Sequence, residues 1–99
     1  MLHVIAILET KPGARDALLQ AIRDNLPAVR AETGFIEYGP TIDHANSFAP
    51  LGPDTVVVIE KWENIEALKA HGAAPHMAAF GEKVKDLLVK RAIHVLEPA

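Results

Sequence analysis

Residues 55–80 read TVVVIEKWENIEALKAHGAAPHMAAF, and the order of elements in this stretch decides the fold. The opening residues 55–62, TVVVIEKW, are rich in β-branched side chains and predict a strand. Asn64 is a good N-cap residue, so a helix is expected to follow it directly. Gly72 and Pro75 interrupt that helix, and a second helix is expected to begin near Pro75, because proline suits the first helical position.

The chain before this stretch predicts a strand, a helix and a second strand. Residues 2–9, LHVIAILE, are apolar on both faces, as in a strand that is covered on both sides. A helix is expected from about residue 13, with Pro27 kinking it or splitting it in two and Gly34 ending it. Residues 35–43, FIEYGPTID, follow as the second strand.

The rest of the chain supplies a long loop at residues 44–54, HANSFAPLGPD, and a last strand at residues 90–97, KRAIHVLE. Such loops in small domains often serve function, so this one is expected either to shape a site or partner contact, or to be a tolerated surface insertion. The order is β-α-β-β-α-β, with the second helical region broken in two. It predicts an α+β fold, a ferredoxin-like split β-α-β antiparallel sheet with helices on one face.

This arrangement leaves one face of the sheet without helices. The predicted strands are too apolar for that face to remain in water, and large exposed apolar patches usually mark an interface. We therefore expect a homodimer in which two sheets pack face to face.

Composition narrows the classes of function. A chain of 99 residues has the size of one domain, and its 49% of hydrophobic residues suffice for a core. The net charge is −3 and no stripe of basic residues is present, so nucleic acid is not an expected partner.

The absence of cysteine excludes disulfides and thiolate metal sites and fits a cytoplasmic location. No apolar run approaches the roughly 20 residues of a membrane helix, and the start lacks the basic leader of a signal peptide, so no membrane partner is expected.

Two histidines, His71 and His76, stand around Pro75. Helical residues at their spacing are roughly 140° apart around the axis, whereas zinc-binding helices use i, i+4 spacing. No carboxylate nearby lies at ligand spacing, so no metal is expected here. The sequence instead predicts a helix–turn–helix corner, with His71 ending one helix and His76 beginning the next. Both side chains can then lean toward one cavity between the helices and the sheet.

Glu60 and Trp62 share one face of the predicted strand at residues 55–62, and either face of that strand can point to the helices. Beside the histidine corner they would form a catalytic site with a carboxylate, an apolar wall and an imidazole. A neutral imidazole can accept a proton from a phenol, and a carboxylate can orient it or stabilise its charged form. The alternative interpretation is structural: Trp62 belongs to the core, Glu60 pairs with a lysine and His71 caps its own helix.

Several other side chains can be interpreted either as part of a site or as purely structural. Tyr38, the only tyrosine, can present its hydroxyl to a cavity or to the dimer face. Met77 and Phe80 lie on the apolar stripe of the last helix and suit either a core or a cavity wall. His3 and His94 lie in the middle of predicted strands, where lone histidines are more often structural than ligands. No glycine-rich turn follows the first strand, so no nucleotide cofactor is expected.

Three motifs together resemble a known family: KPG after the first strand, GFIEYG at the entry to the second, and EKWENIEALKAHGAAPHMAAF at residues 60–80. They resemble the antibiotic biosynthesis monooxygenase domain family, in particular its quinol monooxygenase members. The pattern E-x-W…A-L-x-x-H…P-H-M is fairly specific for the family and poorly specific for the substrate. The resemblance covers residues 1–99 as a single domain.

The resemblance implies a dimeric ferredoxin-like fold of the α/β-barrel type, with a cavity between sheet and helices in each subunit. It also implies oxidation of a quinol or hydroxylated aromatic by molecular oxygen, with no metal, flavin or haem as cofactor. His71 would then be the base or proton shuttle, and Trp62 and Phe80 would be cavity walls. Glu60, Tyr38 and His76 would be polar residues that position the substrate, and Met77 is a further residue expected to bind it.

Other functions occur in the family that the chain resembles. Haem-degrading members need an asparagine on the first strand, which residues 4–8 lack. Members that isomerise a phosphorylated sugar derivative should need a basic site, for which this chain offers only scattered arginines. A non-oxidative isomerase or signal-processing enzyme, and a non-catalytic dimeric module that binds a small ligand, are therefore the alternatives.

Overall fold

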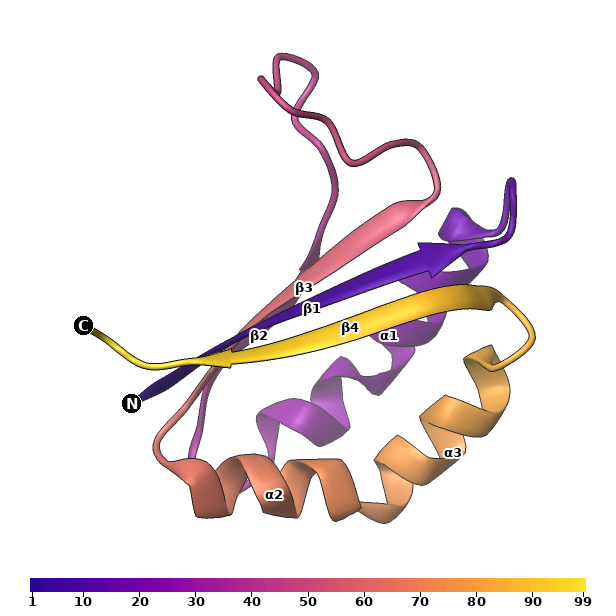
Figure 1. Cartoon of the computed structure of the whole chain (residues 1–99). Coiled ribbons are helices and arrows are strands. Elements are labelled where there is room, and N and C mark those ends of the chain that lie inside the picture. The colour runs from indigo at the N-terminus through magenta and orange to yellow at the C-terminus, as the bar shows by residue number, and fades with distance from the viewer.

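The computed structural model describes all 99 residues and contains four strands and three helices (Figure 1). In chain order they are β1 (Leu2–Thr10), α1 (Arg15–Arg30), β2 (Phe35–Thr41), β3 (Thr55–Trp62), α2 (Ile65–Ala73), α3 (Pro75–Val84) and β4 (Leu88–Leu96). The sheet order is β2-β3-β1-β4, and every neighbouring pair is antiparallel. The helices lie on one face of this sheet, so the predicted α+β ferredoxin-like fold is confirmed. None of the helices has the length and apolar character needed to cross a membrane.

The strand predicted at residues 55–62 has the same bounds in the structure, whereas the other strands differ at their ends. β2 ends at Thr41, whose hydroxyl donates a hydrogen bond of 2.7 Å to the carbonyl oxygen of Val57. β4 begins earlier than predicted, because Leu88 already pairs with Thr10 beyond a register shift in β1. Strand ends are poorly marked in a sequence because pairing with a neighbour decides them.

The strand register places one face of β3 under the helices. Val56, Val58, Glu60 and Trp62 are each at most 5% exposed. The sequence leaves open which face of this strand meets the helices, and the structure shows that it is the face with Glu60 and Trp62. The β1 residues paired with three of these positions complete this part of the core: Val4, Ala6 and Leu8.

α1 is one continuous helix although Pro27 lies inside it. A proline at this position removes one helical hydrogen bond, because it has no N–H to donate. Ile22 and Val29, on either side of the proline, are buried in the core and hold both parts of the helix against the sheet. Of the two effects predicted for Pro27, a split of the helix therefore does not occur.

Gly34 does not end this helix, contrary to the prediction, because α1 already ends at Arg30. Gly34 lies in the turn to β2, where its φ of +80° is one that glycine adopts readily. A Cβ at this position would stand only 2.5 Å from the Cβ of Ala67 in α2. Glycine is therefore needed for the turn between α1 and β2 to lie close against α2.

The corner between α2 and α3 forms with Pro75 at the start of α3, as predicted, whereas Gly72 lies inside α2 and does not interrupt it. The side chain of Asn64 accepts a hydrogen bond of 2.9 Å from the backbone N–H of Ala67, which caps α2. Ala74 has an extended backbone that separates the two helices, and Pro75 is the first residue of α3. His71 lies in the last turn of α2 and His76 in the first turn of α3.

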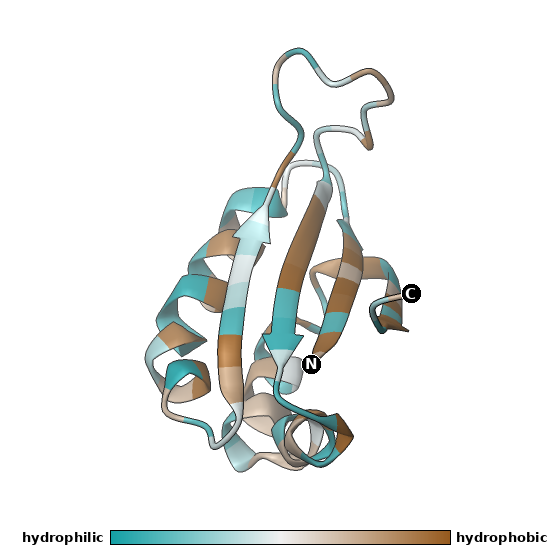
Figure 2. Ribbon diagram, turned by 90° about the vertical axis from the view of Figure 1, so that its left-hand side faces the viewer, coloured by the Kyte–Doolittle hydropathy of each residue, from teal (hydrophilic) through white to brown (hydrophobic).

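The face of the sheet opposite the helices carries apolar side chains. By register this face includes Ile5 opposite Ile59 and Ile7 opposite Val57, and none of these four is fully buried. Figure 2 shows the first half of β3, directly below the loop, in the brown of hydrophobic residues. No helix of the chain covers this face (Figure 1).

The predicted loop extends away from the end of the sheet between β2 and β3 (Figure 1). Its base is closed by Asp43, whose two carboxylate oxygens accept hydrogen bonds of 3.0 and 2.9 Å from the backbone N–H groups of Leu51 and Gly52. These two bonds lower the pKa of Asp43, because they stabilise the charged carboxylate. At the outer part of the loop the side chain of Phe48 is fully exposed.

Candidate active site

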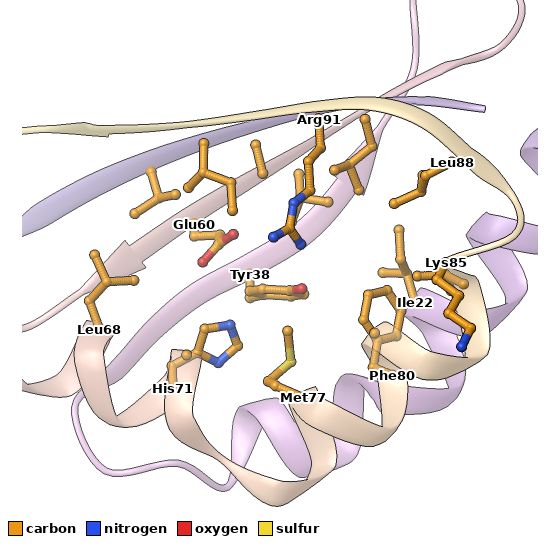
Figure 3. Close-up of a pocket in the computed structure, with 18 of the residues that line it drawn as sticks. Ile22, Tyr38, Glu60, Leu68, His71, Met77, Phe80, Lys85, Leu88 and Arg91 are labelled. Atoms are coloured by element: carbon orange, nitrogen blue, oxygen red, sulfur yellow. The ribbon is translucent and has the colours of Figure 1, made fainter.

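A cavity of about 740 Å³ lies between the sheet and the helices α2 and α3 (Figure 3). Fourteen of its 21 lining residues are hydrophobic, and its volume is within the range of small-molecule sites. Met77 and Phe80 of α3 are among the lining residues, as predicted, and so is Leu68 of α2. An apolar cavity of this size can enclose a flat aromatic ring and exclude most water from it.

His71 brings an imidazole to this cavity from the last turn of α2 (Figure 3). Its ring is tilted against Trp62 at a centroid distance of 4.6 Å and against Tyr38 at 5.5 Å. Its Nδ1 lies 2.7 Å from Oε2 of Glu32. Because an ionised carboxylate only accepts, Nδ1 carries the hydrogen in this pair and Nε2 is left as the nitrogen that can accept a proton.

Glu60 and Trp62 form a second polar pair beside the imidazole. The indole N–H of Trp62 donates a hydrogen bond of 3.0 Å to Oε1 of Glu60. Burial raises the pKa of Glu60, while this hydrogen bond and the nearby His71 act in the opposite direction. Glu60 lines the cavity, whereas Trp62 is fully buried behind it and packs edge-on against Phe35. The structure thus places Trp62 as the support of the site rather than as the cavity wall that was expected.

Tyr38 extends from β2 to the cavity and not to the opposite face of the sheet (Figure 3). The side chain is buried, and this burial raises the pKa of its hydroxyl well above the ordinary value. The negative charges of Glu60 and Glu32 raise this pKa further. Tyr38 is therefore a neutral phenol that can donate a hydrogen bond to a bound molecule.

Glu32 is the residue of this site that sequence reasoning misses. It lies in the turn between α1 and β2, and it contacts both Nδ1 of His71 at 2.7 Å and Nε2 of His76 at 3.4 Å. In the sequence, Glu32 is one of many acidic residues and stands far from both histidines. Its only local signal is its place before Gly34, whose turn lies against α2.

His76 takes a different position from the one expected. It does not line the large cavity with His71, but a separate hollow of about 220 Å³ between α1 and α3. Its Nδ1 lies 3.1 Å from Oδ1 of Asn25. The expectation that both histidines lean into one cavity is not met, because the helix break at Ala74 turns His76 toward α1.

Basic side chains near the cavity were also not foreseen as site residues. Lys85, Lys90 and Arg91 are among the lining residues, and the guanidinium of Arg91 extends toward Glu60 (Figure 3). His3 and His94 lie on the opposite face of the sheet, since His94 is paired with Ile5 and His3 with Lys61. No three carboxylate or histidine side chains are grouped so that they could hold a metal ion.

Comparison with known proteins agrees with the fold and the motifs. The family model described as "Antibiotic biosynthesis monooxygenase" matches residues 1–83. The chain belongs to this family. A relative in Escherichia coli K12 is the protein named "Probable quinol monooxygenase YgiN", which is 41% identical over 102 aligned residues. That alignment covers 99% of this chain and 98% of YgiN.

Solved structures of similar proteins have the same architecture. PA3566 of Pseudomonas aeruginosa superposes with a TM-score of 0.82 at 28% identity, over 99% of this chain and 93% of the other. A crystal structure described as antibiotic biosynthesis monooxygenase superposes with a TM-score of 0.84 at 25% identity, over 100% of this chain and 99% of the other. Family membership therefore rests on both sequence and fold along almost the entire chain.

In this member of the antibiotic biosynthesis monooxygenase family, the site combines three chemical features. The cavity is apolar, His71 offers one nitrogen that can accept a proton, and Tyr38 offers a hydroxyl that can donate one. Glu32 holds the imidazole in one orientation and places a carboxylate beside its Nδ1. Such a site can take a proton from a weakly acidic hydroxyl group and keep the resulting anion away from bulk water.

Proposed function

We propose that this protein is a monooxygenase that oxidises a quinol or another hydroxylated aromatic with molecular oxygen, and that it needs no metal, flavin or haem. The observation that carries this proposal is the pairing of His71 with Glu32 at the wall of an apolar cavity. The name of YgiN as a probable quinol monooxygenase agrees with this class of substrate.

Catalysis begins with the ring of the substrate between the apolar side chains of the sheet and those of α3. The phenolic O–H donates its proton to Nε2 of His71, and the carboxylate of Glu32 stabilises the imidazolium that forms. Tyr38 and Glu60 lie beside His71 and position the oxygen atoms of the substrate. The product of this step is an electron-rich phenolate enclosed in the cavity.

The phenolate supplies the electrons that oxygen needs. A quinol that reacts with one molecule of oxygen gives a hydroxylated quinone and one molecule of water, so one oxygen atom enters the ring and the other leaves as water. The protein contributes the deprotonation, the orientation of the ring and the exclusion of water, which would otherwise stabilise the phenolate and lower its reactivity. Oxygen is small and apolar and can enter a cavity lined largely by hydrophobic residues.

Labelling with ¹⁸O₂ tests the type of reaction. We expect the quinone formed by the metal-stripped protein from a reduced naphthoquinol to carry one ¹⁸O atom, as detected by mass spectrometry. A product without label, formed together with hydrogen peroxide, would identify a two-electron oxidase instead. Turnover of a ligand without oxygen would favour a non-oxidative isomerase, and binding without turnover would favour a ligand-binding module.

We further propose that two copies of the chain pack through the helix-free face of the sheet. This proposal is supported by the apolar side chains at Ile5, Ile7, Val57 and Ile59, which no other part of the chain covers. Leu96 of β4, on the same face, is 51% exposed and extends the apolar surface to the edge of the sheet.

A further inference from the structure

Glu32 connects two histidines that belong to different hollows of the molecule. Its Oε2 lies 2.7 Å from Nδ1 of His71 and 3.4 Å from Nε2 of His76. On the far side of His76, Nδ1 lies 3.1 Å from Oδ1 of Asn25 in α1. Four side chains from three helices and one turn thus form a continuous polar chain through an otherwise apolar part of the protein.

The two ends of this chain lie in different places. His71 is 5% exposed and lines the large cavity. His76 has a side chain that is 25% exposed, and with Asn25 it lines the hollow between α1 and α3. The chain therefore leads from the buried cavity to the surface of the protein on the other side of the helix corner.

The hydrogen bonds of Asn25 fix the direction of the chain. Its amide nitrogen donates to the sulfur of Met77 at 3.3 Å, so its oxygen faces His76 and accepts from Nδ1. In a neutral ring this leaves Nε2 of His76 without a hydrogen, and that atom is buried and has no hydrogen-bond partner. A bare nitrogen opposite a carboxylate oxygen becomes a favourable contact only when a proton lies between them. His76 is thus arranged to accept a proton that reaches Glu32.

We propose that Glu32 and His76 form a proton route between His71 and solvent, which works while substrate fills the cavity. This proposal rests on the proposed function, because it takes His71 as the base that accepts the proton of the substrate. When the substrate O–H bond breaks, an N–H bond forms at Nε2 of His71, and the hydrogen on Nδ1 passes to Oε2 of Glu32. That proton then passes to Nε2 of His76, which leaves a phenolate in the cavity and an imidazolium at the hollow. The same route in reverse supplies a proton when oxygen is reduced to water.

Charged groups on the surrounding elements shape the pH dependence of this route. At the inner end, Tyr38 of β2 and Glu60 of β3 face His71. At the outer end, Asp24 of α1 and Lys83 of α3 line the hollow beside His76 and pair with one another at 3.5 Å. Their opposite charges largely offset each other at the outer end of the route.

Rescue by a small buffer tests the route in the complete protein. In a dilute solution of a bulky buffer, we expect His76→Ala to lower turnover on the order of 10-fold, which is less than the full effect of a primary proton-transfer group. Imidazole should restore most of this loss, because a small base can enter the hollow and replace the missing side chain. His44→Ala is the matched control, since His44 is exposed in the loop and outside the polar chain. Turnover of His76→Ala that is normal, or lowered equally in every buffer, would overturn the proposal.

A second measurement does not depend on turnover and separates this inference from the proposed function. In ¹⁵N spectra of the imidazole rings, we expect the hydrogen of His71 on Nδ1, and we expect Glu32→Gln to shift the Nε2 signal of His76 more than that of His44. The route would be excluded if His71 carried its hydrogen on Nε2. It would also be excluded if Glu32→Gln left the Nε2 signal of His76 unchanged. If the route holds by this test but no oxygen is consumed, the proposed monooxygenase activity fails and the proton connection stands.

Discussion

The carboxylate of Glu32 lies 2.7 Å from Nδ1 of His71, although 39 positions separate the two residues in the chain. The turn after α1 packs against α2 because Gly34 allows its backbone to approach Ala67 in the first turn of that helix. This relationship gives the imidazole a fixed orientation and a nearby negative charge. Deprotonation of a substrate by His71, as proposed above, depends on both.

Glu32→Gln keeps the shape of the side chain and removes its charge. We expect kcat with a quinol substrate to fall at least ~10-fold, because the imidazolium of His71 loses its stabilising charge, while KM changes little. Steady-state kinetics measure the two constants separately. Glu66→Gln, at an exposed site in α2, is the control. A Glu32→Gln enzyme with the kcat of the wild type would contradict the role given to this carboxylate.

The ionisation of Tyr38 can be followed directly because the chain contains a single tyrosine. Burial and the charges of Glu60 and Glu32 raise its pKa, so the ultraviolet absorbance of tyrosinate should not develop at about pH 10, where a free tyrosine ionises. Unfolding in denaturant should return the titration to that ordinary value. A folded protein whose tyrosine ionises at or below about pH 10 would show that Tyr38 is not enclosed as described.

Glu60 predicts a pH dependence of stability. Its pKa is raised in the folded protein by burial, so the unfolded chain releases this proton more readily than the folded one. The stability that comes from the neutral carboxyl is complete below the ordinary value of 4.5 and is lost as the pH rises through the higher folded value. Glu60→Gln removes this loss of stability because glutamine does not ionise. The amide oxygen of glutamine can still accept the hydrogen bond from the indole N–H of Trp62.

Urea unfolding of both proteins across this pH range measures the difference. We expect the free energy of unfolding of Glu60→Gln, relative to the wild type, to increase as the pH rises from acid to neutral. A difference that stays constant or decreases over this range would mean that Glu60 is not destabilised by burial of its charge.

Ile59→Lys tests the proposed dimer. Ile59 is 36% exposed on the helix-free face, so lysine there should leave the fold intact but place a charge in the proposed interface. Sedimentation is expected to show a dimer for the wild type and a monomer, or at least ~10-fold weaker association, for the variant. Ile65→Lys, at a residue of α2 that is 41% exposed, is the matched control. A wild-type monomer, or an unchanged Ile59→Lys dimer, would contradict this interface.

Much of the fold follows from local signals in the sequence. The β-branched run before Trp62 predicts β3, Asn64 predicts the start of α2, and Pro75 predicts the start of α3. These signals work because each depends on the backbone of a few neighbouring residues. The end of α1 could not be predicted from Gly34, because contact of that turn with α2 determines where the glycine is needed.

The candidate site was predictable only in part. His71, Glu60 and Tyr38 stand out as polar residues in apolar elements, and the structure brings all three to one cavity. The partners of these residues depend on contacts between distant segments, so the sequence pattern gives neither the bond of Glu32 to His71 nor the turn of His76 away from the cavity. The same pattern cannot distinguish a wall of the cavity from the support behind it, which is the position of Trp62.

Oxygen uptake by the metal-stripped protein with a freshly reduced naphthoquinol tests the central claim most directly. The wild type and His44→Ala should consume oxygen clearly faster than the quinol does alone. His71→Ala should lower this rate about 100-fold or more, to the level of the uncatalysed reaction, because the base that forms the phenolate is lost. Uptake by the wild type that does not exceed the uncatalysed rate over a panel of quinols, or a folded His71→Ala protein as active as the wild type, would contradict the account.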